Sequence, residues 1–355
     1  MLKRVENLRT KMKKNSLEAF IITNPYNLRY LTGFTGTTGM ALITLEEAYF
    51  ITDFRYTEQA ATQCEGYTIE KNVGPILDKV SELVDISGVA NVAFEETNVT
   101  FKQFVELETL MEQDLIPISG MIEELREVKD ADEIAIIKDA CHIADQAFEH
   151  ILTYIKPGLT EIQVANELDF FMRSKGASGV SFETIVASGL RSAMPHGVAS
   201  DKIIEQGDFI TIDFGCYYNG YVSDMTRTIS LGEPRNSQLK DIYQIVLGAQ
   251  EKVLEVAQAG MTGIELDAVA RDYISEHGYG EAFGHSTGHG IGLEIHEGPN
   301  VSKVAEKAFV PGNVITNEPG IYLPGIGGVR IEDDMLVTKN GVERLTHSPK
   351  ELIIL

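Results

Sequence analysis

The chain has 355 residues, of which 43% are apolar and 23% charged, and its 53 acidic and 30 basic side chains give a net charge of −23. These values are typical of a globular protein of about two domains and exclude a disordered or fibrous chain. The negative charge also argues against nucleic acid as a partner, because an acidic protein gains nothing from the release of phosphate counterions.

The three cysteines, Cys64, Cys141 and Cys216, lie far apart and form no CxxC pair. Such a set predicts neither a disulfide framework nor a thiolate zinc site, and it is typical of a reducing compartment. The sequence also lacks the apolar core of a signal peptide and any apolar run of about 18 residues. We therefore expect a soluble, cytoplasmic protein without a membrane partner.

The N-terminal part predicts an α/β domain over residues 1–122, followed by a second domain over residues 123–355. Helical periodicity predicts helices over 2–14, 54–63, 75–85 and 100–111. Short apolar runs predict strands, which are Ala19–Thr23, Met40–Thr44, Ala48–Thr52, Asn91–Phe94 and Leu115–Ile118. The charged segment Ile122–Asp132 predicts a linker between the two domains.

The second domain contains an internal repeat. Its first helix is expected to begin near Asp130, which has capping-box spacing to Glu133, and to end before Pro157-Gly158. Three short matches then share one constant sequence separation: Ala147 with Ala249, Gly158 with Gly260, and Gly176 with Gly278. In each copy a threonine, Thr160 or Thr262, caps a second helix and a glycine ends it.

Each helix pair is followed by two predicted strands. In the first copy Phe209–Gly215 and Tyr221–Ile229 flank Asn219-Gly220, a strong hairpin signal. In the second copy Val314–Glu318 and Gly328–Leu336 play the same part. The sequence therefore predicts an α+β domain of two helix–helix–hairpin halves, related by a pseudo-twofold axis and sharing one antiparallel sheet.

Strand alternation places acidic residues together on one face of each hairpin. A two-residue loop at Asn219-Gly220 would place Asp213 opposite Thr226, and a four-residue loop would place it opposite Asp224. Either way Asp213 and Asp224 become direct or diagonal neighbours, roughly 5–8 Å apart. The second hairpin adds Glu318, kept extended by the following proline, and Glu332, which shares its face with Arg330.

The repeat would bring all four carboxylates to the pseudo-twofold axis. Like charges at such distances repel each other, and only Arg330 offers a positive charge nearby. We therefore expect divalent cations between the carboxylates. An oxygen-rich ligand set suits manganese, cobalt or zinc better than copper. Four histidines occur in glycine-rich loop sequence and are candidate partners of this site: His196, His285, His289 and His296.

Seven sequence blocks, in this order and spacing, closely resemble the pita-bread metallopeptidases, a family that includes prolidase (Xaa-Pro dipeptidase), aminopeptidase P and methionine aminopeptidase. The blocks are Pro195-His196, Asp213-Phe-Gly, Ser223-Asp224-Met-Thr-Arg, Gly288-His289-Gly-Ile-Gly, His296-Glu, Glu318-Pro-Gly and Val329-Arg-Ile-Glu332-Asp. The N-terminal domain resembles the creatinase-type domain of prolidases through Asn27-Leu-Arg-Tyr-Leu-Thr-Gly33-Phe and Thr52-Asp-Phe-Arg-Tyr56.

The resemblance implies a dinuclear site with two divalent ions per chain, manganese being expected and cobalt or zinc possible alternatives. Asp213 would bind one ion, Asp224 and Glu332 would bridge both, and His289 and Glu318 would bind the other. The implied catalytic residues are His196 and His296, which would act on the substrate and the tetrahedral intermediate, and Glu318, which would carry the proton. Arg330 would order the surrounding shell. The resemblance also implies a homodimer.

The predicted activity is hydrolysis of the Xaa-Pro bond in proline-containing di- or oligopeptides. The short first domain favours a dipeptidase over an Xaa-Pro aminopeptidase, which stays open as the alternative. Two other relatives fit the sequence less well. Creatinase shares both domains but works without metal, whereas all five metal positions are intact here, and methionine aminopeptidase lacks the first domain. A catalytically silent peptide-binding module is the alternative of another class, although such relatives generally lose ligands. Asn317 departs from the aliphatic residue usual before Glu-Pro-Gly, and alternation points it away from the metal face.

Overall fold

The computed structural model describes residues 2–355. It consists of two compact units whose boundary falls between Arg126 and Glu127. Within the described residues, no helix combines the length and the apolar character that crossing a membrane requires.

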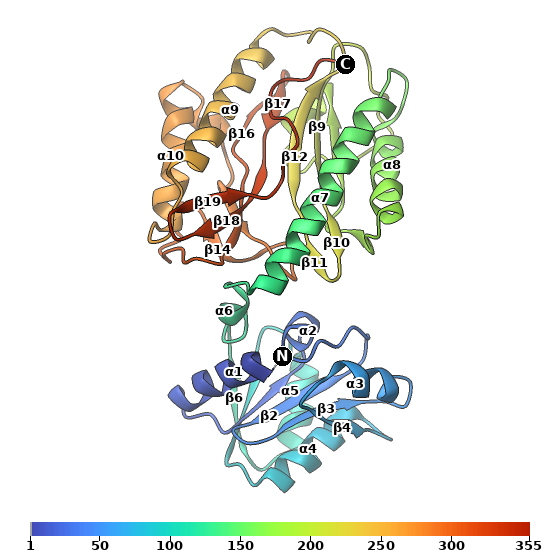
Figure 1. Ribbon diagram of the computed structural model, residues 1–355, viewed down its shortest axis with the longest axis vertical. Coiled ribbons are helices and arrows are strands. Elements are labelled where there is room, and N and C mark those ends of the chain that lie inside the picture. Colours follow the sequence, from blue (N-terminus) through green and yellow to red (C-terminus); the bar gives the residue numbers. More distant parts are fainter. Residues whose placement is uncertain (1) are drawn as a thin grey trace. The chain divides into compact units, whose positions relative to one another are not determined.

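The first unit is a mixed sheet of six strands in the order β4-β3-β2-β1-β5-β6. Its strands are β1 (Ala19–Ile22), β2 (Met40–Thr44), β3 (Ala48–Thr52), β4 (Thr68–Lys71), β5 (Asn91–Glu95) and β6 (Asp114–Ile118). Its helices are α1 (Leu2–Lys14), α2 (Pro25–Thr32), α3 (Thr57–Gln63), α4 (Ile76–Ser87), α5 (Phe101–Leu110) and α6 (Glu123–Arg126). The predicted α/β class is confirmed, and Figure 1 shows this unit in blue to cyan.

Three elements of this unit, α2, β4 and α6, were missed by the sequence analysis, which interpreted the segment that contains α6 as a linker. The start of α2 carries clear signals, because Asn24 Oδ1 accepts hydrogen bonds from the N–H groups of Tyr26 and Asn27 and Pro25 occupies the first turn. Gly33 ends this helix with a φ of 76°. Strand β4 lies at the sheet edge and pairs only with β3, so its residues are partly exposed and show no apolar alternation.

The second unit contains four long helices that flank a set of short strands. They are α7 (Ala131–Tyr154), α8 (Glu161–Ser174), α9 (Gln238–Val256) and α10 (Gly263–Glu276). Figure 1 shows the green pair α7 and α8 on one side of the strands and the orange pair α9 and α10 on the other. Capping boxes at Asp130, Thr160 and Thr262 confirm the predicted helix starts. Gly176 and Gly278 follow the helix ends with φ values of 103° and 85°, as the repeat predicts.

The strands of this unit form four small sheets, so the prediction of one shared antiparallel sheet was wrong. The sheets are β11-β10-β7, β12-β9-β8, β14-β13-β15-β18-β19 and β16-β17. The bounds are β7 (Gly179–Val180), β8 (Ile185–Ser188), β9 (Phe209–Phe214), β10 (Cys216–Tyr218), β11 (Tyr221–Val222) and β12 (Met225–Ser230) in the first half. In the second half they are β13 (Gly288–Gly290), β14 (Glu297–Val301), β15 (Val314–Asn317), β16 (Gly320–Leu323), β17 (Gly327–Arg330), β18 (Asp333–Thr338) and β19 (Gly341–Arg344).

The long hairpins are interrupted where the acidic residues lie. Glu318 and Pro319 separate β15 from β16, and proline has no N–H to continue the ladder. Ile331 and Glu332 likewise separate β17 from β18. The predicted second hairpin is therefore divided, with β15 paired to β18 and β16 paired to β17. Backbone hydrogen bonds join the two halves, among them the one from Glu332 N to Thr226 O at 3.1 Å.

The first hairpin has the two-residue loop. Tyr218 pairs with Tyr221 and Asp213 pairs with Thr226. Asn219 and Gly220 both have positive φ, 46° and 85°, as a type I′ turn requires. A break follows β9 at Gly215, where a Cβ would lie 1.8 Å from the carbonyl oxygen of Ser223, so only glycine fits. Asp213 and Asp224 are therefore diagonal rather than direct neighbours.

Candidate metal centre

Four acidic side chains from the two halves lie at the breaks and edges of these strands. Asp213 is in β9, Asp224 precedes β12, Glu318 follows β15 and Glu332 precedes β18. Asp213, Asp224 and Glu332 are 8%, 5% and 1% exposed, and the side chain of Glu318 is 16% exposed. The negative charge of four carboxylates at one largely buried site must be balanced by positive charge, by protonation or by metal ions.

His289, in β13, lies among these carboxylates. Its Nε2 atom is 3.4 Å from Glu318 Oε1 and 3.7 Å from Asp224 Oδ2. One ligand atom each from Asp224, His289 and Glu332 lies within 4.8 Å of the others. The other ring nitrogen, Nδ1, is 3.1 Å from the carbonyl oxygen of Gly290 and therefore donates to it. This hydrogen bond leaves Nε2 with its lone pair directed at the carboxylates, the tautomer that binds metal.

The pKa values of the cluster reflect a site with too little positive charge. Burial raises the pKa of Asp224 and Glu332 well above the ordinary range, and the neighbouring carboxylates raise both further. Burial also raises the pKa of Glu318 to about 8 and lowers that of His289 to about 4. The imidazole of His289 is therefore neutral near pH 7, and it contacts the carboxylates as a potential ligand rather than as an ion-pair partner.

Two oxygen atoms of the cluster have no protein partner. Asp213 Oδ1 and Asp224 Oδ1 are buried and accept no hydrogen bond. Buried carboxylate oxygens are normally satisfied, so unpaired ones beside further carboxylates and a neutral imidazole fit the coordination of a cation. The donor set of hard oxygens and one ring nitrogen matches manganese, cobalt or zinc. The residues that the sequence analysis chose thus form a group with the chemistry of a divalent-metal site.

A shell of hydrogen bonds orients the acidic side chains. Arg330 Nη2 donates to Asp213 Oδ2 at 2.6 Å, and Arg330 Nη1 donates to the hydroxyl of Tyr322 at 2.7 Å. The hydroxyl groups of Thr226 and Thr316 donate to Glu332 Oε2 at 2.6 Å and to Glu318 Oε1 at 3.1 Å. The sequence analysis missed both threonines, although each lies two residues from a predicted ligand and therefore shares its face of the strand.

The hydroxyl of Tyr322 also contacts His285, a histidine to which the sequence analysis assigned no specific role. His285 Nε2 is 2.8 Å from Tyr322 Oη, and His285 Nδ1 is 2.8 Å from the carbonyl oxygen of Ser286. Burial lowers the pKa of His285 to about 4, and the nearby charge of Arg330 lowers it further. The neutral ring donates to Ser286 and accepts from Tyr322, which completes a chain from His285 through Tyr322 and Arg330 to Asp213.

The predicted catalytic histidines, His196 and His296, are the exposed members of the predicted site. The rings of His289 and His296 are 4.3 Å apart between centroids, in an edge-on arrangement. Partial burial lowers the pKa of His296, and the charge of His196 lowers it further while Asp213 opposes this effect. Both His196 and His296 are exposed, unlike the metal-facing residues. They are therefore placed where a substrate can reach them.

The glycines around His289 allow neighbouring backbone segments to pack closely. A Cβ on Gly288 would lie 2.1 Å from the carbonyl oxygen of Thr316, and one on Gly290 would lie 2.3 Å from that of Gly298. These glycines allow β13 to fit tightly between β14 and β15. The tight fit holds the main chain of His289 beside the strand that leads to Glu318.

The fold and the acid-rich centre together define a metallopeptidase. Residues 135–339 match the model of metallopeptidase family M24, and residues 4–128 match the creatinase/prolidase N-terminal domain. The chain belongs to metallopeptidase family M24 and has the pita-bread architecture preceded by a creatinase-type domain. The predicted fold and enzyme class are confirmed.

Three solved structures are similar to this chain over nearly its whole length. An Xaa-Pro dipeptidase from Bacillus anthracis is 53% identical with a TM-score of 0.98, over 100% of this chain and 99% of its own. A prolidase from Pyrococcus horikoshii is 42% identical with a TM-score of 0.94, over 99% and 100% of the two chains. An X-Pro aminopeptidase from Thermotoga maritima is also 42% identical, with a TM-score of 0.91, over 97% and 100%.

Proposed function

We propose that this chain is an Xaa-Pro dipeptidase that hydrolyses the bond before proline in short peptides. The observation that carries the proposal is the buried group of four carboxylates and His289, in which two carboxylate oxygens have no protein partner. The full-length likeness to an Xaa-Pro dipeptidase and a prolidase supports the substrate class. Retention of every proposed ligand argues against a silent peptide-binding module.

In this proposal the site holds two divalent cations, manganese being preferred and cobalt or zinc the alternatives. Asp213 would hold one cation, Asp224 and Glu332 would bridge the pair, and His289 and Glu318 would hold the second. When bound, the cations supply Lewis acidity and lower the pKa of a water molecule toward neutrality. The unpaired oxygens of Asp213 and Asp224 support their assignment as ligands.

The remaining chemistry belongs to the side chains. Glu318 would carry the proton from the attacking water to the leaving nitrogen, because it is a carboxylate of the cluster whose side chain is still 16% exposed. His296 and His196 would bind the substrate carbonyl and stabilise the negative charge that develops on its oxygen. Arg330 keeps Asp213 in place through the 2.6 Å hydrogen bond. The departing nitrogen is that of proline, a tertiary amide without an N–H group.

The decisive experiment compares peptides on the metal-loaded enzyme. Ala-Pro should be cleaved rapidly, Ala-Ala far more slowly, and Ala-Pro-Ala poorly. Faster cleavage of Ala-Pro-Ala would instead establish the alternative, an Xaa-Pro aminopeptidase, which the likeness to the Thermotoga maritima enzyme favours. Equal rates on Ala-Ala and Ala-Pro would refute proline specificity. Elemental analysis should find two divalent ions per chain, and a fully active metal-free protein would refute the proposed centre.

We also propose a cytoplasmic homodimer. The three cysteines are free and buried, as expected in a reducing compartment. The creatinase-type domain contributes none of the proposed ligands, so its contribution would be to assembly and to limiting substrate length. Sedimentation of the intact protein at assay concentration should give a dimer. A fully active monomer would contradict the assembly.

A further inference from the structure

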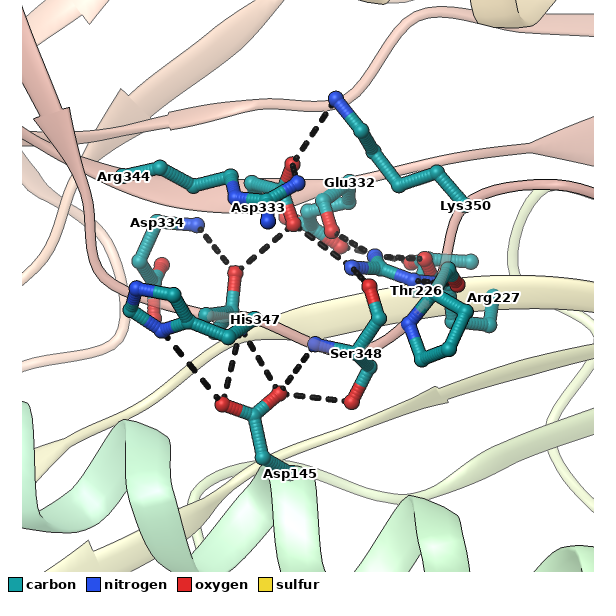
Figure 2. A network of polar contacts seen from close by, with 12 residues as sticks. Asp145, Thr226, Arg227, Glu332, Asp333, Asp334, Arg344, His347, Ser348 and Lys350 are labelled. Carbon is teal, nitrogen blue, oxygen red and sulfur yellow. Dashed lines mark hydrogen bonds and ion pairs between the residues drawn. The ribbon is translucent and has the colours of Figure 1, made fainter.

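A second polar network includes Arg227, the residue that follows Thr226 in β12 (Figure 2). The hydroxyl of Thr226 donates to Glu332 on the metal side. Arg227 is the next residue, so its side chain points to the other face of the strand. Arg227 is 1% exposed, and no predicted role was assigned to it from the sequence.

The guanidinium group of Arg227 has five N–H bonds, and the structure gives an acceptor for each. Nε donates to the carbonyl oxygen of Pro349 at 2.9 Å, and Nη2 donates to that of Ser348 at 2.8 Å and to Asp333 Oδ1 at 2.7 Å. Nη1 donates to the carbonyl oxygen of Thr226 at 2.9 Å and to that of Glu332. Full satisfaction of a buried guanidinium fixes its position and orientation.

The contact with Glu332 has a specific consequence. Glu332 lies in the break between β17 and β18, so no strand pairing holds its peptide group. Its N–H donates to the Thr226 carbonyl, and its own carbonyl accepts from Arg227. Thr226 and Arg227 therefore take the place of strand pairing at Glu332. The Thr226 hydroxyl holds the Glu332 carboxylate, while the Thr226 carbonyl and the Arg227 guanidinium hold the Glu332 main chain.

The other acceptors of Arg227 are themselves held in place. Asp145, on α7, accepts hydrogen bonds from the N–H groups of His347 and Ser348 at 2.9 Å and 2.7 Å. Asp333 Oδ1 also accepts from the hydroxyl of Thr346, and its Oδ2 accepts from Gln250 Nε2 at 2.7 Å. Figure 2 shows Ser348 between Asp145 and the Arg227 side chain. The frame that orients the guanidinium thus includes α7, α9 and the segment 346–349.

We propose that Arg227 is a positioning residue for the metal centre. It locks the main chain of Glu332 at the strand break, so that the Glu332 carboxylate stays directed at Asp224 and His289. Asp333 supplies the charge partner that keeps the guanidinium in place. This inference rests on the proposed role of Glu332 as a bridging ligand. Groups that orient metal ligands from outside typically change metal affinity or activity by roughly 10–100-fold when they are altered.

The alternative is that Arg227 only stabilises the fold. The two readings differ in their effect on metal affinity. Arg227→Lys keeps the positive charge but has three donors on one nitrogen and cannot reach acceptors spread around a planar group. We expect Arg227→Lys to weaken binding of Mn²⁺ by roughly 10–100-fold, measured by competition with a chelator of known affinity. A matched control is Leu168→Ala, which opens a cavity in the apolar core beneath α8 and changes neither a proposed ligand nor a contact of Arg227.

The outcomes separate this inference from the proposed function. Unchanged Mn²⁺ affinity in Arg227→Lys, with lower stability like that of Leu168→Ala, would overturn the positioning role. If Arg227→Lys does not fold, Asp333→Asn provides the second variant, because it removes the charge partner and leaves the carbonyl contacts of Arg227. Its Mn²⁺ affinity should also fall, and an unchanged value would overturn the inference. Glu332→Gln is measured in parallel, and if it retains both ions, the proposed ligand set fails instead.

Discussion

Asp224→Asn should have opposite effects on the metal-free and the metal-loaded protein. An oxygen of Asp224 and one of Glu332 lie within 4.8 Å of each other, both residues being buried. Two unit charges at that distance repel by roughly 3 kcal/mol at an effective dielectric constant near 20. Burial and this repulsion together raise the pKa of the Asp224 carboxyl group. The amide group introduced by Asp224→Asn has the same shape as the neutral carboxyl group and carries no charge at any pH, so it does not repel Glu332.

At pH 8 the metal-free variant should therefore be as stable as the wild type, or more stable by up to roughly 3 kcal/mol. With Mn²⁺ present the order should reverse, because the variant loses a proposed bridging ligand and with it one ion. Hydrolysis of Ala-Pro should fall by on the order of 10²-fold or more. The measurements are urea denaturation with chelator and with Mn²⁺, elemental analysis and initial rates.

Asp208→Asn is the control for this prediction. Asp208 is 3% exposed and pairs with Lys202 at 2.8 Å, so its loss should destabilise the protein equally with and without metal. An Asp224→Asn variant that behaves in the same way, or that keeps wild-type activity, would refute the reasoning.

Three further predictions follow from the same geometry. His296→Ala should lower kcat, at a loss of roughly 2–4 kcal/mol of transition-state stabilisation, while both ions remain bound. If elemental analysis shows that this variant has lost metal, His296 is a ligand instead. The metal-free protein should lose stability between about pH 6.5 and pH 8, because the unfolded chain has released the proton of Glu318, whose pKa rises from 4.5 to about 8 on folding. The loss from Glu318 amounts to about 2 kcal/mol, and a urea midpoint that rises over this range with chelator present would contradict it. Asn317→Leu should change Ala-Pro hydrolysis by less than about twofold, because Asn317 Nδ2 donates to the carbonyl of Gln250 on α9 and not to the metal face; a large loss of activity in initial-rate measurements would show that Asn317 supports the site.

The fold class and the group of chemistry-bearing residues could be read from the sequence. Alternation on each hairpin selected Asp213, Asp224, Glu318 and Glu332, because side chains two residues apart share a face whatever the rest of the fold does. The constant separation of the helix caps and glycines revealed the two halves, since caps and turn glycines are local signals. The sequence left the register of the first hairpin open between a two-residue and a four-residue loop, and the structure has the two-residue loop.

The tertiary structure decided what connects these residues. The sequence predicted one sheet, but breaks at Gly215, Pro319 and Glu332 divide it, because close backbone approach and a missing N–H are properties of neighbours in space. The chain from His285 through Tyr322 to Arg330 joins residues far apart in the sequence. Periodicity reports which face a side chain occupies and carries no information about its partner on that face. Only packing of the two halves could place Arg227 on the carbonyl of Glu332.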